Sequence, residues 1–214
     1  VVFQGLRIFG LMMVVTGSMW AFFQQKFNRL LGYLLISSTG MMLLSIGLDL
    51  PAGIYLSSYL VFLRLAAFFT LVWSVFVLQR AKGELSLGII KSIFYLSPIL
   101  GSSILLALFS SAGMPLTAGF PVMQGLYAFL AATDRLLAIA VIVSTGLVSL
   151  IVIRISFFVF GRDHGGTMGL TGLSSKERII FLTLIIFLVA AGLFPNLFFN
   201  GFGRVVSGFE FLVK

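Results

Sequence analysis

Cysteine is absent from the 214 residues of this chain, and histidine occurs once, as His164. The lack of thiols excludes disulfide bonds and thiolate-held metal or redox centres. The single histidine lies in a polar stretch, which excludes a histidine-built metal or haem site within an apolar segment. The sequence therefore predicts no metal and no cofactor on this chain.

Charged residues are also scarce, at 9% of the sequence, whereas 60% of the residues are hydrophobic. Soluble domains carry about 25% charged residues. The mean hydropathy is +1.17, and the apolar stretches have about the 20 residues that a membrane-spanning helix needs. Barrel strands would instead be short and alternating. The composition predicts an all-α, multi-pass integral membrane protein.

The apolar stretches predict a polytopic helix bundle of about six transmembrane helices, which form a single transmembrane domain over residues 1–214. The predicted spans are approximately 5–23, 30–48, 54–78, 93–132, 136–160 and 179–199. The fourth, at forty residues from 93 to 132, is too long for one crossing and short for two. One crossing with an unwound middle fits it best.

Lysine and arginine are distributed unevenly between the two ends of the predicted spans. One side collects Lys26, Arg29, Arg80, Lys82, Lys91, Arg162, Lys176 and Arg178, and the other collects Arg7, Arg135, Arg204 and Lys214. The richer side is predicted to be cytoplasmic or its equivalent. The formal net charge of +8 then reflects loops that face anionic lipid, and no nucleic-acid partner is expected.

The middle of the fourth span, "SSAGMPLTAGFPVMQ", is unsuited to a continuous helix. Pro115 and Pro121 each remove a backbone donor, and Gly113 and Gly119 relax the chain beside them. Backbone groups freed within the membrane are tolerated only inside protein or around a wet cavity. The pattern predicts a break within 113–120, of the kind that marks an ion or substrate site. The alternative is a proline kink that only improves packing.

Arg64 is the one charge near the middle of a predicted span, about ten residues into 54–78. Insertion of a guanidinium at that depth costs roughly 2.5–3.5 kcal/mol, so Arg64 is predicted to face the bundle interior and bind an acceptor. Two interpretations remain open. Arg64 is either a fixed positive charge beside an ion path, or a packing strut bound to carbonyls of the broken helix.

Two motifs carry a resemblance to a known family, and a third supports it. "AGMPLTAGF" resembles the A-G-x-P-x-T-x-G-F stretch of the antiporter-like subunits of respiratory complex I, and of their relatives in multisubunit cation/proton antiporters and membrane-bound hydrogenases. "QQKFNRLLGYLLISSTGMMLLSIGL" is similar to the family's Q-x-D-I-K-R-L-L-A-Y-S-S-I-S-H-M-G run, and "GLFPN" is a weaker match near the last span.

The resemblance implies a particular part of such a subunit. The six spans correspond to the second inverted repeat plus the last helix, so a separate chain or segment is expected to supply the first repeat. The implied function is that of a membrane-arm subunit of a complex-I-like NADH:quinone oxidoreductase, which contributes to or scaffolds proton translocation. The alternatives are an antiporter or hydrogenase subunit, or a structural subunit that no longer pumps.

The resemblance also implies a setting for the chain. It would be one subunit of a redox-driven ion translocase, with the redox chemistry on other chains and no redox or hydrolytic site here. Its partners would be other membrane subunits and the lipid bilayer. Its location would be a bacterial plasma membrane or the inner membrane of an energy-transducing organelle.

The sequence departs from the family where protons are handled. Met123 stands where the family has lysine or glutamate, and Ser38 stands where it has histidine. Either protons pass through Thr117, Gln124 and Tyr127 with water, and with Arg64 and Ser38 as further candidates, or this half has lost pumping and kept a scaffold role. Both interpretations stay open at the level of sequence.

Overall fold

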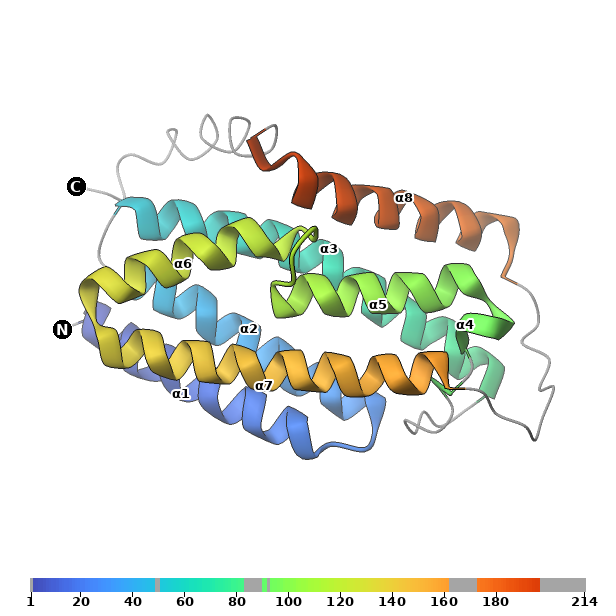
Figure 1. The fold of residues 1–214 in the computed structure, drawn as a ribbon, viewed down its shortest axis with the longest axis horizontal. Helices are drawn as coiled ribbons and strands as arrows, with labels where there is room; N and C mark the ends of the chain where they lie inside the picture. Colours follow the sequence, from blue (N-terminus) through green and yellow to red (C-terminus); the bar gives the residue numbers. More distant parts are fainter. Residues whose placement is uncertain (1, 49–50, 83–89, 92, 162–172, 197–214) are drawn as a thin grey trace.

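The structure is a computed structural model that describes residues 2–48, 51–82, 90–91, 93–161 and 173–196. Within these ranges every regular element is a helix, which confirms the predicted all-α class. The axes of the long helices are roughly aligned with one another (Figure 1). They are α1 (Val2–Phe23), α2 (Phe27–Gly47), α3 (Pro51–Lys82), α4 (Ile93–Leu96), α5 (Pro98–Ala112), α6 (Gly119–Thr133), α7 (Arg135–Phe160) and α8 (Ser175–Leu193).

Four of the described helices, α1, α2, α3 and α7, are each long and apolar enough to cross a membrane. α5 and α6 have 15 residues each and are therefore about 22 Å long, too short for the roughly 30 Å hydrocarbon core. Figure 1 shows them occupying opposite halves of the bundle and meeting near its middle. The count of six spans stays a prediction.

Two of the predicted spans are interrupted, in each case at the residue before a proline. The predicted span 93–132 is interrupted already at Ser97, which is extended (φ −148°, ψ 92°) ahead of Pro98, the first residue of α5. α8 ends at Leu193 because Phe194 precedes Pro195 and leaves the helical region (φ −121°, ψ 59°), and the chain is helical again at Pro195 and Asn196. A residue before proline is disfavoured in the α conformation. Residues 197–199 lie outside the described part.

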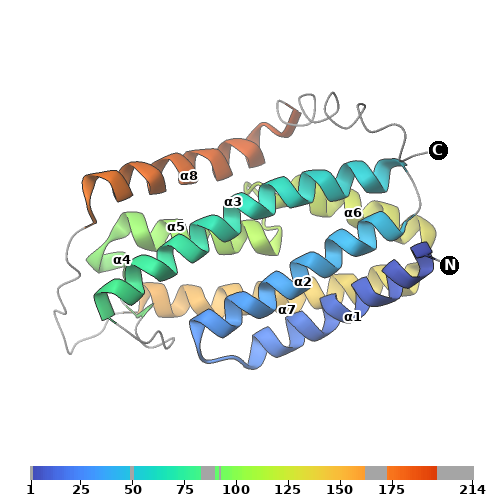
Figure 2. The same cartoon turned by 180° about the vertical axis from the view of Figure 1, so that it is seen from behind.

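Helices α1 and α2 form the most closely packed pair, and Figure 2 shows them side by side. Glycines allow this approach. A Cβ at Gly10 would lie 2.8 Å from the carbonyl oxygen of Gly40, and a Cβ at Gly17 would lie 2.6 Å from the backbone nitrogen of Ser37. Small residues at such contacts are how membrane helices bring their backbones together.

Substitution of Gly17 by valine is expected to separate α1 from α2, because the new side chain would overlap the α2 backbone rather than a flexible side chain. We expect destabilisation by about 1–3 kcal/mol, measured as a lower thermal-unfolding midpoint of the solubilised protein. Gly5→Val is the matched control, since Gly5 lies on the same helix with nothing within 4 Å of its Cβ position. Equal midpoints for the two variants would contradict this account of the pair.

Candidate functional site

The candidate site is built around the break between α5 and α6. α5 ends at Ala112 because Gly113 takes the left-handed conformation (φ 69°, ψ 35°). The Gly113 N–H donates to the Ser110 carbonyl at 3.2 Å, and the Met114 N–H donates to the Phe109 carbonyl at 3.0 Å. This bond pair is a Schellman motif, which satisfies two of the carbonyls that a helix end leaves free. The predicted break within 113–120 is confirmed.

The connection that follows is short and tightly held. The Thr117 hydroxyl donates to the Met114 carbonyl at 2.6 Å, and Leu116 has a positive φ of 68°, a conformation that costs energy in a residue other than glycine. α6 begins at Gly119, where a Cβ would overlap the Ser110 carbonyl oxygen of α5. Helix α8 also touches the connection, since a Cβ at Gly192 would overlap Leu116 and Thr117 backbone atoms.

The two prolines of this stretch play different parts. Pro115 lies in the connection itself and is exposed. Pro121 lies in the first turn of α6, where its missing N–H would have had no helical partner. Pro121 therefore belongs to the start of the second half-helix and is not part of the unwound segment.

Arg64, from the middle of α3, reaches the end of α5. Its side chain is 5% exposed, and its Nη1 donates to the Ser111 carbonyl at 2.7 Å, next to the two carbonyls that the Schellman motif uses. Its Nη2 lies 3.8 Å from the Met41 Sδ on α2. A helix C-terminus carries partial negative charge, so a cation is stabilised there. The predicted inward orientation of Arg64 is confirmed, with a carbonyl of the broken helix as its acceptor.

A second polar contact links α6 to α7 close to Arg64. The Tyr127 hydroxyl donates to the Thr145 Oγ1 at 2.8 Å, and the Thr145 hydroxyl donates onward to the Val141 carbonyl at 2.9 Å. Tyr127 lies within electrostatic range of Arg64. Arg64 with Ser111 and Tyr127 with Thr145 are two separate hydrogen-bonded pairs, between α3 and α5 and between α6 and α7, and we call these four residues the polar cluster around Arg64.

Ser38 lies on α2, on the face that also carries Met41. Its hydroxyl is buried, with 2% of the residue exposed, and has no hydrogen-bond partner among the described residues. Ser38 lies three residues before Met41, so the two share a face of α2, and Met41 contacts Arg64.

Met123, at the family's lysine or glutamate position, and its neighbour Gln124 point in different directions. Met123 is fully buried and packs on the helix break, because a Cβ at Gly113 would lie 2.7 Å from the Met123 Cγ. Gln124 is exposed on the outer face of α6, whereas Tyr127 is half-buried and turned towards α7. Tyr127 and Arg64 therefore both point into the bundle, whereas Gln124 points away from it.

Two further arginines bind helix ends in the same way as Arg64, and the sequence analysis did not assign them this role. Arg154 of α7 donates to the Phe22 carbonyl at 2.6 Å and the Gln24 carbonyl at 2.8 Å, at the end of α1. Arg7 of α1 donates to the Gly47 and Leu48 carbonyls at the end of α2. Cations stabilise helix C-termini. The signal in the sequence is positional, since Arg7 lies near the start of the predicted span 5–23 and Arg154 near the end of the predicted span 136–160.

Residues 2–150 match the family described as NADH:quinone oxidoreductase/Mrp antiporter, TM. The chain belongs to this family. The predicted antiporter-like relationship is thereby confirmed, and the chain is an integral, multi-pass membrane protein.

One member of the family aligns with most of the chain. It is 27% identical over 197 residues to NADH-quinone oxidoreductase subunit N 2 of Syntrophobacter fumaroxidans, an alignment that covers 89% of this chain and 41% of that protein. The chain described here therefore spans less than half the length of the curated relatives that it matches.

Chains in two solved membrane complexes share the fold of this chain. A chain of respiratory complex I from Thermus thermophilus with bound NADH has a TM-score of 0.83 at 23% identity, with 99% of this chain and 45% of that chain covered. A chain of the Mrp complex from Dietzia sp. DQ12-45-1b has a TM-score of 0.81 at 16% identity, with 94% and 46% covered. The fold is thus common to redox-linked and antiporter assemblies.

Proposed function

We propose that the chain is a membrane-arm subunit of a complex-I-like NADH:quinone oxidoreductase, in a bacterial plasma membrane or the inner membrane of an energy-transducing organelle. The observation that carries the proposal is the interrupted helix α5–α6, with its polar cluster around Arg64, in a chain of this family. The name of the relative from Syntrophobacter fumaroxidans supports the redox-linked assignment over the alternatives. An Mrp-type antiporter or a membrane-bound hydrogenase would use the same helices, and the proteins that co-purify with the chain distinguish these cases.

Within that complex we assign this half mainly a scaffold role. A proton-pumping site needs a group that stores charge between steps, and a buried ionisable side chain does so because desolvation shifts its pKa. Met123 is apolar and fills the helix break. The side chains of Tyr127, Thr145 and Ser38 are neutral, and Arg64 keeps its proton. Such a cluster relays protons through water but couples weakly to a distant redox event.

The partners we propose are other membrane subunits, including a chain or segment that supplies the first inverted repeat. The exposed face of α6 favours a protein neighbour. Gln124 lies on that face, in the half of the membrane that α6 spans, and burial of an amide in lipid without a hydrogen bond is unfavourable. The neighbouring positions Ala128 and Ala132 are small and exposed as well, which lets another helix approach closely.

Replacement of Gln124 by leucine tests the scaffold assignment. We expect proton uptake to be unchanged, since Gln124 lies apart from the cluster around Arg64. The measurement is redox-driven proton uptake by vesicles that contain the assembled complex. Ala128→Leu is the matched control, because Ala128 lies one turn further along the same exposed face. Loss of uptake in Gln124→Leu alone, with assembly intact, would contradict the scaffold role and establish a conducting path through Gln124.

A second experiment introduces an ionisable group instead of removing a polar one. Replacement of Met123 by lysine restores the residue that the family has at this position. The new ammonium would be buried at the helix break beside the positive Arg64 cluster, so we expect weaker assembly and no gain in pumping. Met123→Leu controls for the change of shape alone. A higher ratio of protons taken up to electrons transferred in Met123→Lys would show that the family's lysine is the single missing part, and that this half is otherwise competent.

A further inference from the structure

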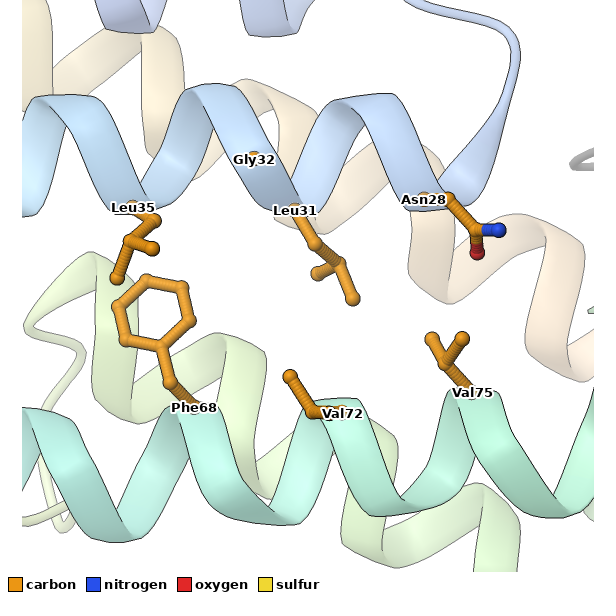
Figure 3. A pocket seen from close by; sticks show the side chains of 7 residues that line it. All are labelled: Asn28, Leu31, Gly32, Leu35, Phe68, Val72 and Val75. Carbon is orange, nitrogen blue, oxygen red and sulfur yellow. The ribbon is translucent and has the colours of Figure 1, made fainter.

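Two grooves flank the first turns of α2, and the walls of the first are mostly apolar. The first, of about 240 Å³, runs between α2 and α3 (Figure 3). In Figure 3 the Leu35 side chain lies beside the Phe68 ring and closes one end of the groove, whereas Asn28 stands at the other end. Between these ends the walls are the apolar side chains of Leu31, Val72 and Val75.

The second groove, of about 410 Å³, lies on the other side of α2 and is lined by Arg29, Tyr33 and Ile36. Gly32 lines both grooves. A Cβ at Gly32 would meet nothing within 4 Å, so the surface of α2 is lowest between the two grooves. One branched ligand with two apolar arms would fit across Gly32.

The open end of the grooves lies at the depth of lipid headgroups. Asn28 and Arg29 belong to the first turn of α2 and are both exposed, at the end predicted to face the cytoplasm. Trp20 of α1 stacks on Tyr33 with 6.4 Å between ring centroids, and tryptophan and tyrosine mark the membrane–water interface. From Asn28 to Leu35 the first groove descends seven residues, or about 10 Å, into the hydrocarbon region.

We propose that these grooves bind one anionic phospholipid, with an acyl chain in each groove and the phosphate on Arg29. The apolar walls suit acyl chains, and a guanidinium binds phosphate oxygens in a bidentate geometry. Lys26, at the same end of α2, adds positive charge. Anionic lipids concentrate in the cytoplasmic leaflet, which this end faces in the predicted orientation. The inference does not depend on which complex of the family contains the chain.

The test measures which lipids stay bound to the assembled complex after purification in mild detergent and exchange into mixed phosphatidylglycerol–phosphatidylcholine micelles. Native mass spectrometry reports the bound lipid. We expect wild type to retain phosphatidylglycerol over phosphatidylcholine, and Arg29→Gln to lower that preference about fivefold, the contribution of one basic residue near a membrane surface. Gly32→Phe, which fills the junction of the grooves, should abolish retention of both lipids.

Two control variants match the two changes. Arg135 is also an exposed arginine in the first turn of a helix, α7, and Gly146 is also an exposed glycine with nothing within 4 Å of its Cβ position. Arg135→Gln and Gly146→Phe should leave retention unchanged. The proposal is overturned if Gly32→Phe retains lipid as wild type does, or if wild type shows no preference for the anionic lipid. It is also overturned if Gly32→Phe releases a neighbouring subunit without changing the bound lipid, since a protein helix would then occupy the grooves.

Discussion

Arg64→Glu is expected to destabilise the bundle by about 3–5 kcal/mol, the cost of an uncompensated buried charge. The arginine is 5% exposed and donates to the Ser111 carbonyl at the C-terminal end of α5. A carboxylate there would face the negative end of a helix dipole and the carbonyl oxygen itself, with no donor in place. The thermal-unfolding midpoint of the assembled complex is the measurement.

Other residues at position 64 separate charge from packing. Arg64→Lys keeps the cation and should lose no more than about 1.5–3 kcal/mol, the range for one hydrogen bond that involves a charged group. The stability of Arg64→Met should fall between those of the lysine and glutamate variants. The hydrogen bond to Ser111 is lost, but methionine also avoids the cost of burying a charge. Equal stability of the lysine, methionine and glutamate variants would mean that the charge of Arg64 has no structural role.

Arg135→Glu is the control for a change of sign at a helix end. Arg135 is exposed and begins α7, and a negative charge is favourable at a helix N-terminus. We therefore expect no loss of stability, and at most a small gain. Destabilisation as large as that of Arg64→Glu would indicate a general sensitivity to acidic substitutions and not a specific effect at the break.

Gly119→Ala is expected to have the largest effect of any single methyl group in the described part of the chain. The new Cβ would overlap the Ser110 carbonyl oxygen, which already accepts the Gly113 N–H in the motif that ends α5. The two half-helices would have to separate, at a cost of about 3 kcal/mol or more. We expect a lower unfolding midpoint and protease cleavage within 113–118, detected by mass spectrometry of the fragments.

The control for this substitution is Gly146→Ala on α7. Gly146 lies in a continuous helix with free space at its Cβ position, so alanine there should stabilise the chain by up to about 1 kcal/mol through its higher helix propensity. A neutral Gly119→Ala would show that α5 and α6 approach less closely than the structure has them.

The break at α5–α6 was predictable because its cause is local. Proline lacks an N–H and glycine tolerates a left-handed backbone, so "AGMPLTAGFP" ends a helix wherever it lies. The positions where helices stop were less predictable. The pattern of apolar residues continues through Ser97 and Phe194, and the restriction that the following proline imposes on each residue outweighs that pattern.

The sequence predicted that Arg64 binds an oxygen atom, but not which residue supplies that oxygen. Insertion cost alone requires a buried arginine to bind oxygen, but the choice of Ser111 depends on α3 passing the end of α5, a contact between residues 47 positions apart. The same limit applies to Gln124 and Tyr127. Their spacing of three residues predicted a shared face, yet Gln124 is exposed while Tyr127 turns inward to bond Thr145 on α7.

The sequence by itself determined that this chain is an apolar helix bundle without cysteine, that its fourth span is broken, and that it belongs with the antiporter-like subunits. These properties follow from composition, local backbone chemistry and short motifs, which act within a few residues. Only the tertiary structure decided that Met123 fills the break, that three arginines bind the ends of neighbouring helices, and that two grooves meet at Gly32. Each of these depends on which helix faces which, and packing between distant segments sets that arrangement.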